Sequence, residues 1–523
     1  MKKIVTILIL AALTGVSCKK FLDSKPIDFI SPVNYYNTEK DLNQALAGMY
    51  DRLGDLRVYG RGMHYFMVHS DEFFIKGATS GINGFVFDAS NLEIGRHWEA
   101  VYTGIERANM LLENIHNAEG NVDEDIINET RGQALFMRAF YHFLLADEFG
   151  PIPLKISSTK TPEEDPLPRS PLSEVYAQVV KDMKEAIPLL RNISEYGFNG
   201  KISKTAAQGM LARVFLTMAG APLNDVSKYE EARLYADSVM QSGEHALNPD
   251  FKQIFINHVR EVYDVKECLW EVEFGGNNQG TIREGGSVGS YNGIYCTNID
   301  TGWCSDLVHA TAKLYNAYEE EDLRRDWSIA DFRFVASGNT VVRTPWGPTE
   351  IYERNNGKWR REYETLLPRN KDFNGTNWPM LRYADVLLMF AEADNYVNGG
   401  PSPAAYRALN QVRRRGYGKP VDVADPTVDA PENMSQADFL EYIKNERLRE
   451  LAFEGLRKHD LIRWGTYVST MQQQAAIYDA TMPTALKAAA VGQASRITAR
   501  AVVFPIPNSE LNVNHNITQN PGW

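Results

Sequence analysis

Apolar residues recur at helical spacing along most of the chain. In the stretches 41–53 and 98–115 they fall three or four residues apart, which is the period of an amphipathic α-helix. The stretch 121–150 continues this pattern and ends at Gly150-Pro151, a common stop signal for a helix. The same period returns in 171–190, 203–219, 229–241, 379–397, 403–415, 435–453 and 458–480. The pattern therefore predicts a mostly helical protein.

Several of the predicted helices come as pairs joined by short turns. The pairs are 97–117 with 124–149, 171–193 with 203–219, and 380–398 with 402–415. The second helix of each pair carries a small residue followed by apolar residues at a similar spacing, and these small residues are Ala139, Ala207 and Ala405. This spacing is typical of tetratricopeptide-like hairpins, in which small residues let neighbouring helices approach closely. We expect the three alanines to lie at close helix crossings.

The pattern changes between the two helical regions. Gly, Asn, Asp and Trp become frequent, the helical period fades, and only short strand-like runs such as 269–274 remain. The predicted fold class is all-α, a superhelix of tetratricopeptide-like hairpins with a large irregular, loop-rich insertion. We divide the chain into a signal peptide (1–17), an N-terminal helical part (18–250), the insertion (251–378), and a C-terminal helical part (379–523) that packs as one unit with the N-terminal part.

The first residues form a targeting segment. Lys2 and Lys3 precede a ten-residue apolar stretch, 4–13, which is too short to span a bilayer as a helix. Small residues and Cys18 follow, and this order resembles a bacterial lipoprotein signal, in which the cysteine is lipidated. The alternative is a plain secretory signal with an incidental cysteine. Since no other stretch approaches 18 consecutive apolar residues, we expect a protein tethered to a membrane through Cys18 that does not span it.

Charge and cysteine content narrow the choice of function. Lys plus Arg number 55 against 67 Asp plus Glu, a formal charge of −12. Nucleic-acid binding depends on neutralising phosphates, so this charge argues against a nucleic acid as partner. Four cysteines in 523 residues exclude a disulfide scaffold. Cys296 and Cys304 could pair in an oxidising compartment or remain buried free thiols.

Catalytic and metal motifs are weak. The string Gly285-Gly-Ser287-Val-Gly289 fits G-x-S-x-G, but its surroundings predict a loop and not the strand and helix of a nucleophile elbow. The ten histidines show no metal-ligand spacing, and no nucleotide-binding or zinc-protease motif is present. No cofactor is predicted; Ca²⁺ in the loop region remains possible without a ligand pattern that argues for it. Two suitably placed carboxylates, the requirement of a glycosidase, are not excluded among 67 acids.

Aromatic residues concentrate in the irregular insertion. Five of the nine tryptophans lie within 300–380: Trp303, Trp327, Trp346, Trp359 and Trp378. Aromatic rings supply large contact area at low entropic cost, and sugar C–H faces stack on them. We expect at least half of these tryptophans to be core. The predicted glycan-binding residues are Trp303, Trp346, Tyr291, Tyr295, Asn292 and Asp71, with the loop 76–91, including Phe85 and Phe87, as a second wall.

Several motifs occur together in one order. They include Arg131-Gly-Gln-Ala-Leu-Phe-Met-Arg138, Leu381-Arg382-Tyr383-Ala384-Asp385, Glu446-Arg447-Leu-Arg-Glu450, Arg457-Lys-His-Asp460-Leu-Ile-Arg463-Trp464-Gly465, and the ending Asn520-Pro521-Gly522-Trp523. Together they resemble the SusD/RagB family of outer-membrane lipoproteins from Bacteroidetes. The resemblance runs from Cys18 to Trp523 and is unspecific only over about 60–97 and 250–375. On physical grounds we expect the Arg and Glu residues of these motifs to be ion-paired packing and not ligand contacts.

The resemblance implies a function. It implies a lipid-anchored outer-membrane protein at the cell surface that lies as a lid on a SusC-like TonB-dependent transporter and captures an oligosaccharide without cleaving it. Lys19 and Lys20 follow the cysteine, where surface-exported lipoproteins often carry acidic residues. The sequence therefore does not decide on which face of the outer membrane the protein lies. The alternatives are a surface glycoside hydrolase and a helical-repeat scaffold that binds a peptide or protein.

Overall fold

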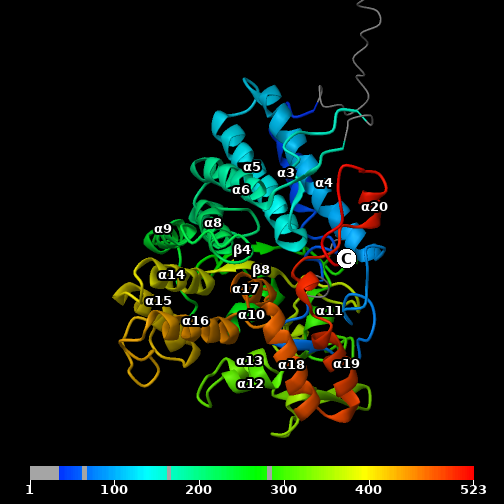
Figure 1. Cartoon of the computed structure of the whole chain (residues 1–523), viewed down its shortest axis with the longest axis vertical. Helices are drawn as coiled ribbons and strands as arrows, with labels where there is room; N and C mark the ends of the chain where they lie inside the picture. Colours follow the sequence, from blue (N-terminus) through cyan, green and yellow to red (C-terminus); the bar gives the residue numbers. More distant parts are fainter. Residues whose placement is uncertain (1–34, 62–66, 162–165, 280–284) are drawn as a thin grey trace, which may run out of the picture.

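In the computed structural model, residues 35–61, 67–161, 166–279 and 285–523 are described, and Cys18 lies outside them (Figure 1). The N-terminal helices are α3 (Glu39–Tyr50), α4 (Leu92–Asn114), α5 (Glu124–Phe149), α6 (Leu172–Ala186), α8 (Lys204–Ala219) and α9 (Lys228–Gln241). The C-terminal helices are α14 (Tyr383–Val397), α15 (Pro403–Gly416), α16 (Gln436–Glu450), α17 (Arg457–Arg463), α18 (Tyr467–Thr481), α19 (Thr484–Ser495) and α20 (Asn508–Leu511). No helix in these ranges is both long and apolar enough to cross a bilayer.

The helices pack as a continuous array. α4 packs on α5 and α14 on α15, as the sequence predicts. α6 and α8 touch, but α6 packs mainly on α5 and α8 mainly on α9, so the second predicted pair is shared with its neighbours. α9 also packs along α14, which joins the two helical regions, and Figure 1 shows these helices side by side. Ala139, Ala207 and Ala405 are completely buried, in keeping with tight packing at these positions.

Local sequence sets where the helices begin and end. The side chain of Asn91 accepts hydrogen bonds from the first backbone N–H groups of α4, and Ser402 does the same for α15. α5 ends at Gly150, whose φ of 72° is a conformation that favours glycine. Gly465, with φ of 70°, separates α17 from α18, so the single helix predicted over 458–480 is in fact two. The break is a consequence of the positive φ that only glycine adopts without strain.

The prediction of an all-α fold needs a correction, because the described residues also contain four two-stranded antiparallel sheets. The paired strands are β1 (Phe73–Ile75) with β5 (Val308–Ala310), β2 (Ile152–Pro153) with β3 (Arg169–Ser170), β4 (Cys268–Val272) with β8 (Trp378–Arg382), and β6 (Phe332–Ser337) with β7 (Thr340–Pro345). The strand-like run 269–274 is therefore confirmed as β4. The β1–β5 pair attaches the segment before the 76–91 loop to the insertion. The two strands are more than 200 residues apart, so no local sequence pattern predicts that they pair.

The insertion contains more regular secondary structure than predicted. It contains the ten-residue helix α10 (Phe251–Arg260) and the short helices α11 (Val288–Asn292), α12 (Ala312–Ala317) and α13 (Arg325–Ser328). Trp327, Trp359 and Trp378 are buried in its core, so three of the five clustered tryptophans are packing residues. These large rings pack together with aliphatic residues such as Leu269, Leu314 and Ile329. Trp303 and Trp346 are only partly buried.

Buried ion pairs hold the C-terminal helices to the insertion. Glu450 of α16 contacts three guanidinium groups, those of Arg382 at 3.0 Å, Arg415 at 2.6 Å and Arg324 at 3.1 Å. All four side chains have almost no exposure. The expectation that the Arg and Glu residues of the sequence motifs are ion-paired packing is confirmed for this helix. A buried charge stays ionised only when it is paired and hydrogen-bonded, so the network fixes how α16 sits against α15 and β8.

His459 of α17 forms ion pairs with α5 that are sensitive to alkaline pH. Its Nδ1 lies 2.7 Å from Asp147 and its Nε2 lies 3.3 Å from Glu148, both on α5. Burial alone lowers the pKa of His459, but the two carboxylates outweigh it and raise the pKa to about 10. Since the folded pKa exceeds the unfolded value of 6.5, this stabilisation is complete below about pH 6.5 and is lost as the pH rises toward 10.

We therefore expect the free energy of unfolding to fall more between pH 6.5 and 10 in the native protein than in His459→Gln. The side chain is 21% exposed, so solvent screening limits the difference to about 1–2 kcal/mol. Urea denaturation across this pH range measures it. His116→Gln is the control, because His116 is exposed and its removal should leave the native pH dependence unchanged. Equal pH dependence in the native protein and His459→Gln would contradict the assignment.

Candidate functional site

A narrow antiparallel contact organises the loop 294–306. Cys296 and Cys304 lie directly opposite each other, and each N–H donates to the other residue's carbonyl, at 3.2 and 3.0 Å. Side chains alternate across such a pair. Both cysteines point inward and are buried as free thiols, whereas Tyr295 and Trp303 point to the other side. The outward residues Tyr295, Thr297, Trp303 and Ser305 are called the aromatic face.

Trp303 is held by its backbone and keeps part of its ring accessible. Arg361 Nη1 donates to the Trp303 carbonyl at 2.6 Å, and Lys371 Nζ lies 4.7 Å from the indole centroid. Gly302 precedes the tryptophan with φ of 120°, and a Cβ there would lie 2.5 Å from Arg361 Cβ. Only glycine lets the loop approach Arg361 this closely. The ring is therefore fixed in position, with a cation on one side.

Tyr295 lies beside a partly exposed cluster of charged groups. Its ring is 40% exposed, and its backbone N–H donates to Asn355 Oδ1 at 3.2 Å. Asn355 Nδ2 in turn donates to Asp306 Oδ1 at 3.1 Å. Lys76 Nζ lies 2.7 Å from Asp306 Oδ2 and 3.3 Å from Glu353 Oε2. These side chains, Lys76, Asp306, Glu353 and Asn355, are called the polar cluster, and its carboxylate oxygens and ammonium group are suited to binding hydroxyls.

The charges of the polar cluster are stable near neutral pH. Partial burial raises the pKa of Asp306, but hydrogen bonds from His309, Lys76 and Asn355 outweigh burial and hold that pKa well below its usual range. Desolvation lowers the pKa of Lys76, but Asp306 and Glu353 outweigh it, so the net shift is upward. Asp306 is therefore an ionised acceptor and Lys76 a charged donor. Neither is a proton donor or acceptor for chemistry at pH 7.

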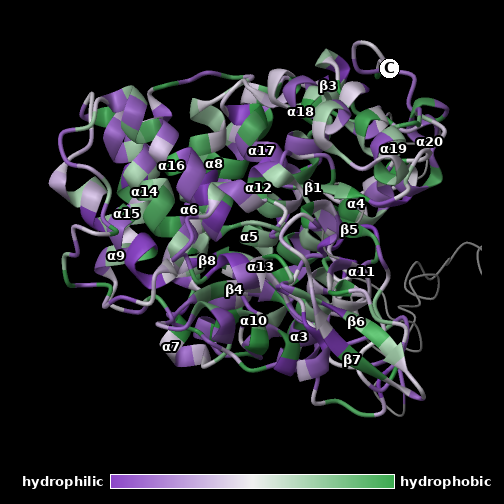
Figure 2. Cartoon of the chain, turned by 90° about the horizontal axis from the view of Figure 1, so that it is seen from below, coloured by the Kyte–Doolittle hydropathy of each residue, from purple (hydrophilic) through white to green (hydrophobic). Residues whose placement is uncertain are grey.

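A β-hairpin that the sequence analysis missed borders the aromatic face. β6 and β7 project at one edge of the molecule, where Figure 2 shows hydrophobic residues on both strands. Val335 pairs with Val342, and both are exposed. Asn298 Nδ2 donates to the Asn339 carbonyl in the hairpin turn at 3.1 Å, which ties the loop 294–306 to the hairpin. Gly338-Asn339 between two alternating runs was the available signal for this hairpin.

Trp346 and Tyr291 lie near cations as well. Trp346 follows β7, and the guanidinium of Arg333 lies 4.5 Å from its ring centroid. The guanidinium of Arg61 lies 5.1 Å from the Tyr291 centroid. Both rings are partly buried. Each thus offers less open ring surface than Tyr295.

Two of the predicted ligand contacts are corrected by their burial. Asp71 is completely buried, and Arg457 binds both of its oxygens, at 2.7 and 2.9 Å, while Lys313 Nζ lies 2.5 Å away. Its carboxylate is a structural ion pair and has no free surface for a sugar. Asn292 is also completely buried and donates to the carbonyls of Arg61 and Val288, both at 2.8 Å. Its amide fixes the backbone just before the loop 294–306 and does not reach solvent.

The two phenylalanines of the predicted second wall pack against other rings. Phe85 is buried and packs edge-on against Phe87 at 5.0 Å, and Phe87 stacks on Trp523 at 5.0 Å. The two rings anchor the C-terminal residue to the 76–91 loop. Only Lys76, at the start of this loop, reaches the polar cluster. The sequence could not separate these roles, because Trp523 and Phe87 are more than 400 residues apart.

Ser287, the serine of the G-x-S-x-G string, has a structural role. It is buried, and its Oγ donates to the Asp372 carbonyl at 2.6 Å. It precedes α11, a helix of only five residues, and follows no strand of the described chain. A nucleophile elbow instead presents an exposed hydroxyl hydrogen-bonded to a histidine.

A second opening lies away from the predicted segment. It is a groove of about 970 Å³ lined by the first half of α4, by α20 and by residues within 153–159 and 166–167. Trp98 and Tyr102 lie in its wall, together with charged residues such as Glu99 and Lys155. Trp98 is nearly buried, and its Nε1 donates to Glu510 at 3.2 Å. The indole of Trp98 is therefore committed to packing.

Comparison with known proteins places the chain among relatives of one kind. A family model described as the SusD family matches residues 266–523, and one described as "Starch-binding associating with outer membrane" matches residues 20–216. SusD-like protein P2 of Formosa agariphila is 27% identical over 489 residues, covering 88% of this chain and 91% of the relative.

Solved structures agree with this over nearly the whole length. The crystal structure of a SusD homolog from Bacteroides thetaiotaomicron has a TM-score of 0.87 and 29% identity, covering 94% of this chain and 98% of that one. Surface glycan-binding protein A from Bacteroides uniformis has a TM-score of 0.68 and 22% identity, covering 92% and 99%. The second likeness, at this identity, is a likeness of fold.

Proposed function

Because the chain belongs to the SusD family, we propose that it is a non-catalytic lipoprotein that captures an oligosaccharide and delivers it to a SusC-like TonB-dependent transporter. The observation that carries the proposal is the aromatic face beside the polar cluster. Tyr295 is 40% exposed and Trp303 is partly exposed. The backbone N–H of Tyr295 donates to Asn355, whose side chain donates in turn to Asp306 of the polar cluster. A relative of the same fold is named a surface glycan-binding protein, which supports a glycan as the ligand.

The chemistry of the site suits binding without cleavage. Aromatic rings stack on the C–H faces of sugar rings, while the polar cluster exchanges hydrogen bonds with hydroxyls. A glycoside hydrolase needs one carboxylic acid that stays protonated near neutral pH to protonate the leaving group. The pKa of Asp306 is shifted the other way, mainly by hydrogen bonds from His309 and Lys76 that outweigh its burial. We include Tyr291 and Trp346 as outer contacts of the same site.

Incubation with a panel of polysaccharides tests this function. Retarded migration in a gel that contains the ligand polysaccharide, with no product sugars released, is the expected result. Product sugars would instead identify a glycoside hydrolase. Migration unchanged by every polysaccharide, together with capture of a peptide or protein, would identify a helical-repeat scaffold. A glycan array then determines which linkage and chain length bind.

The proposed location is the outer membrane, with a lipid anchor at Cys18. Support comes from the lipoprotein-like signal and from the family description that names association with the outer membrane. A diacylglycerol thioether plus an N-acyl chain supplies more than one acyl tail, which is enough for stable anchoring.

Cys18→Ala should move the protein from the membrane fraction to the soluble fraction, because the variant has no thiol to lipidate. Fractionation followed by immunoblotting measures the shift. Cys304→Ala is the control, because this buried cysteine cannot be an anchor and the variant should stay with the membrane. Continued membrane retention of Cys18→Ala would show that another contact holds the protein there.

A further inference from the structure

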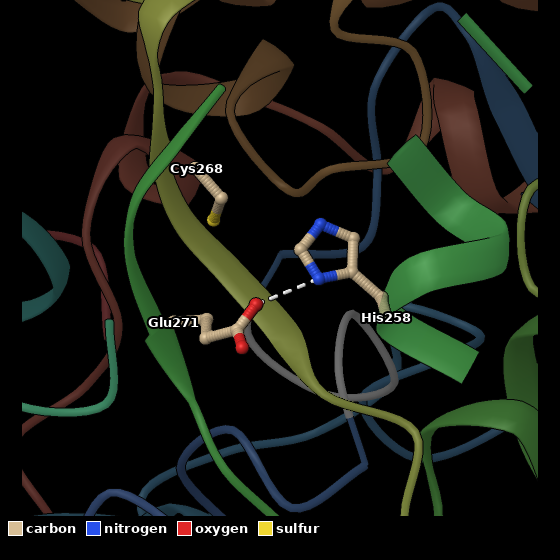
Figure 3. A group of neighbouring side chains, drawn as sticks. All are labelled: His258, Cys268 and Glu271. Carbon is tan, nitrogen blue, oxygen red and sulfur yellow. Dashed lines mark ion pairs between the residues drawn. The ribbon is translucent and has the colours of Figure 1, made fainter. Parts of the chain in front are cut away.

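Three side chains of the metal-binding types meet below the β4–β8 sheet, away from the aromatic face. His258 comes from α10, and Cys268 and Glu271 come from β4 (Figure 3). One ligand atom from each lies within 4.8 Å of the other two, and all three residues are buried. Figure 3 shows the thiol and the carboxylate on one side of the imidazole, which faces both. The spacing 258–268–271 matches no familiar motif, so the sequence gives no sign of this cluster.

His258 is an unusual buried residue. It is 3% exposed, yet neither ring nitrogen has a hydrogen-bond partner within the described part of the chain. Nδ1 lies 2.7 Å from Glu271 Oε2, but this contact lacks hydrogen-bond geometry. Buried polar atoms are nearly always hydrogen-bonded, so an unsatisfied pair on one ring needs an explanation such as a missing ion. Cys268 Sγ has only long contacts to carbonyls, at 3.5 and 3.8 Å.

The other groups around the cluster hold the ligands in place. Asn377 Nδ2 donates to Glu271 Oε1 at 3.0 Å, which leaves Oε2 turned toward the imidazole. The backbone N–H of Asn377 donates to the His258 carbonyl at 3.1 Å. Asn377 thus connects the side chain of Glu271 to the backbone of His258. Such outer contacts are what orient the ligands of a metal site.

An acidic cavity leads to the cluster. It has a volume of about 440 Å³, and Glu271 forms part of its wall. Four further carboxylates line it: Asp51, Asp55, Glu261 and Glu273. Arg52 is the one basic residue of the wall and pairs with Asp51, so carboxylates outnumber it. A cavity with such an excess of one charge raises the local concentration of counter-ions. Cations are therefore drawn toward Glu271 from solvent.

We propose that His258, Cys268 and Glu271 bind one zinc ion, entering from the acidic cavity. Zinc takes nitrogen, sulfur and carboxylate oxygen at about 2.0–2.3 Å, so its ligand atoms must lie within about 4.6 Å of one another, and small side-chain rotations meet this limit. Calcium and magnesium prefer oxygen ligands only. Binding releases the Cys268 thiol proton, and one thiolate plus one carboxylate neutralise the divalent charge. A neutral buried site avoids the cost of an unpaired charge.

The consequence of such an ion is structural. It joins α10 to β4, and β4 pairs with β8, which leads directly into α14. The site would therefore attach α10 to the β4–β8 sheet beside Glu267, which pairs with Arg382 at 2.8 Å and with Arg415 at 3.5 Å in the ion network. Binding only to the folded chain raises its stability by linkage.

Metal analysis of the full protein tests the proposal. After incubation with zinc and removal of excess metal, the native protein should retain one zinc ion per protein molecule. Elemental mass spectrometry measures the bound zinc. Cys268→Ser and His258→Gln should each bind zinc at least about tenfold more weakly. Cys304→Ser is the matched control, a buried free cysteine outside the cluster, and it should retain the native equivalent.

Cobalt supplies a readout that needs no variant. Cobalt added to the chelator-treated native protein should give a thiolate-to-metal charge-transfer absorption in the near ultraviolet, and Cys268→Ser should lose it. A native protein that retains no zinc and shows no such absorption overturns the proposal, whether or not the variants fold. Full zinc retention and an unchanged cobalt spectrum in Cys268→Ser would overturn the assignment of the ligand.

Discussion

Glu450→Ala is expected to lower the free energy of unfolding by about 3–5 kcal/mol, the cost of leaving buried charges without their partner. Glu450 lies within 3.1 Å of Arg324, Arg382 and Arg415, whose side chains have almost no exposure. Each of these guanidiniums keeps one or more other carboxylates, but all three lose the one that they share. The shared position of Glu450 explains why a single truncation should have so large an effect.

Urea denaturation of the native protein and the variant measures this loss. Glu441→Ala is the matched control, because Glu441 lies on the same helix, is 67% exposed and pairs only with Lys444. Its unfolding free energy should stay within about 0.5 kcal/mol of the native value. A loss of less than about 1 kcal/mol in Glu450→Ala would show that the remaining carboxylates satisfy the arginines unaided.

The ionisation of Glu450 also predicts that the protein loses stability in acid. Burial raises the pKa of Glu450, but Arg415, Arg382 and Arg324 outweigh it and hold the pKa at about 2, below its unfolded value of 4.5. Because the folded pKa is the lower one, this stabilisation is present above about pH 4.5 and is lost as the pH falls toward 2. Glu450→Ala should show a weaker loss of stability over that range than the native protein does.

Truncation of the aromatic face should weaken glycan binding strongly. Tyr295→Ala and Trp303→Ala should each cost about 1–3 kcal/mol of binding free energy, because each removes a stacking surface. That is roughly a tenfold to hundredfold rise in the dissociation constant. Trp346→Ala should also weaken binding, by less, since Arg333 already covers part of its ring. Calorimetric titration with the glycan found by the array measures each value.

The controls separate a binding site from a core position. Tyr396→Ala changes a residue that is 38% exposed on α14, outside the insertion, and should bind normally. Helical circular dichroism and the melting temperature of Tyr295→Ala and Trp303→Ala should stay near native, because both rings lie on the outer side of the loop. Normal binding by both variants would place the ligand elsewhere. Unfolding of both would show that these rings are packing residues.

Local pattern was sufficient for the helical architecture. The 3.6-residue period located the helices, and Gly150 marked the end of α5, because helix formation depends on residues within a few positions of each other. The β6–β7 hairpin was also within reach of local pattern, through Gly338-Asn339, but it was missed. The family resemblance likewise rested on contiguous motifs. In the structure Arg382, Glu446, Arg447, Glu450 and Arg463 of these motifs form buried ion pairs.

The composition of the site depended on contacts that no local pattern carries. Asp71 is paired with Arg457, 386 positions away, and this distant partner turns a predicted ligand contact into a buried ion pair. Trp303 and Trp359 occur in similar loop sequence, yet one lies on the outer side of the Cys296–Cys304 contact and the other in the core. Composition and period determined that aromatic rings gather in the insertion and that helices surround it. Only the tertiary structure decided which rings reach solvent, because burial depends on the surfaces that meet when distant segments pack together.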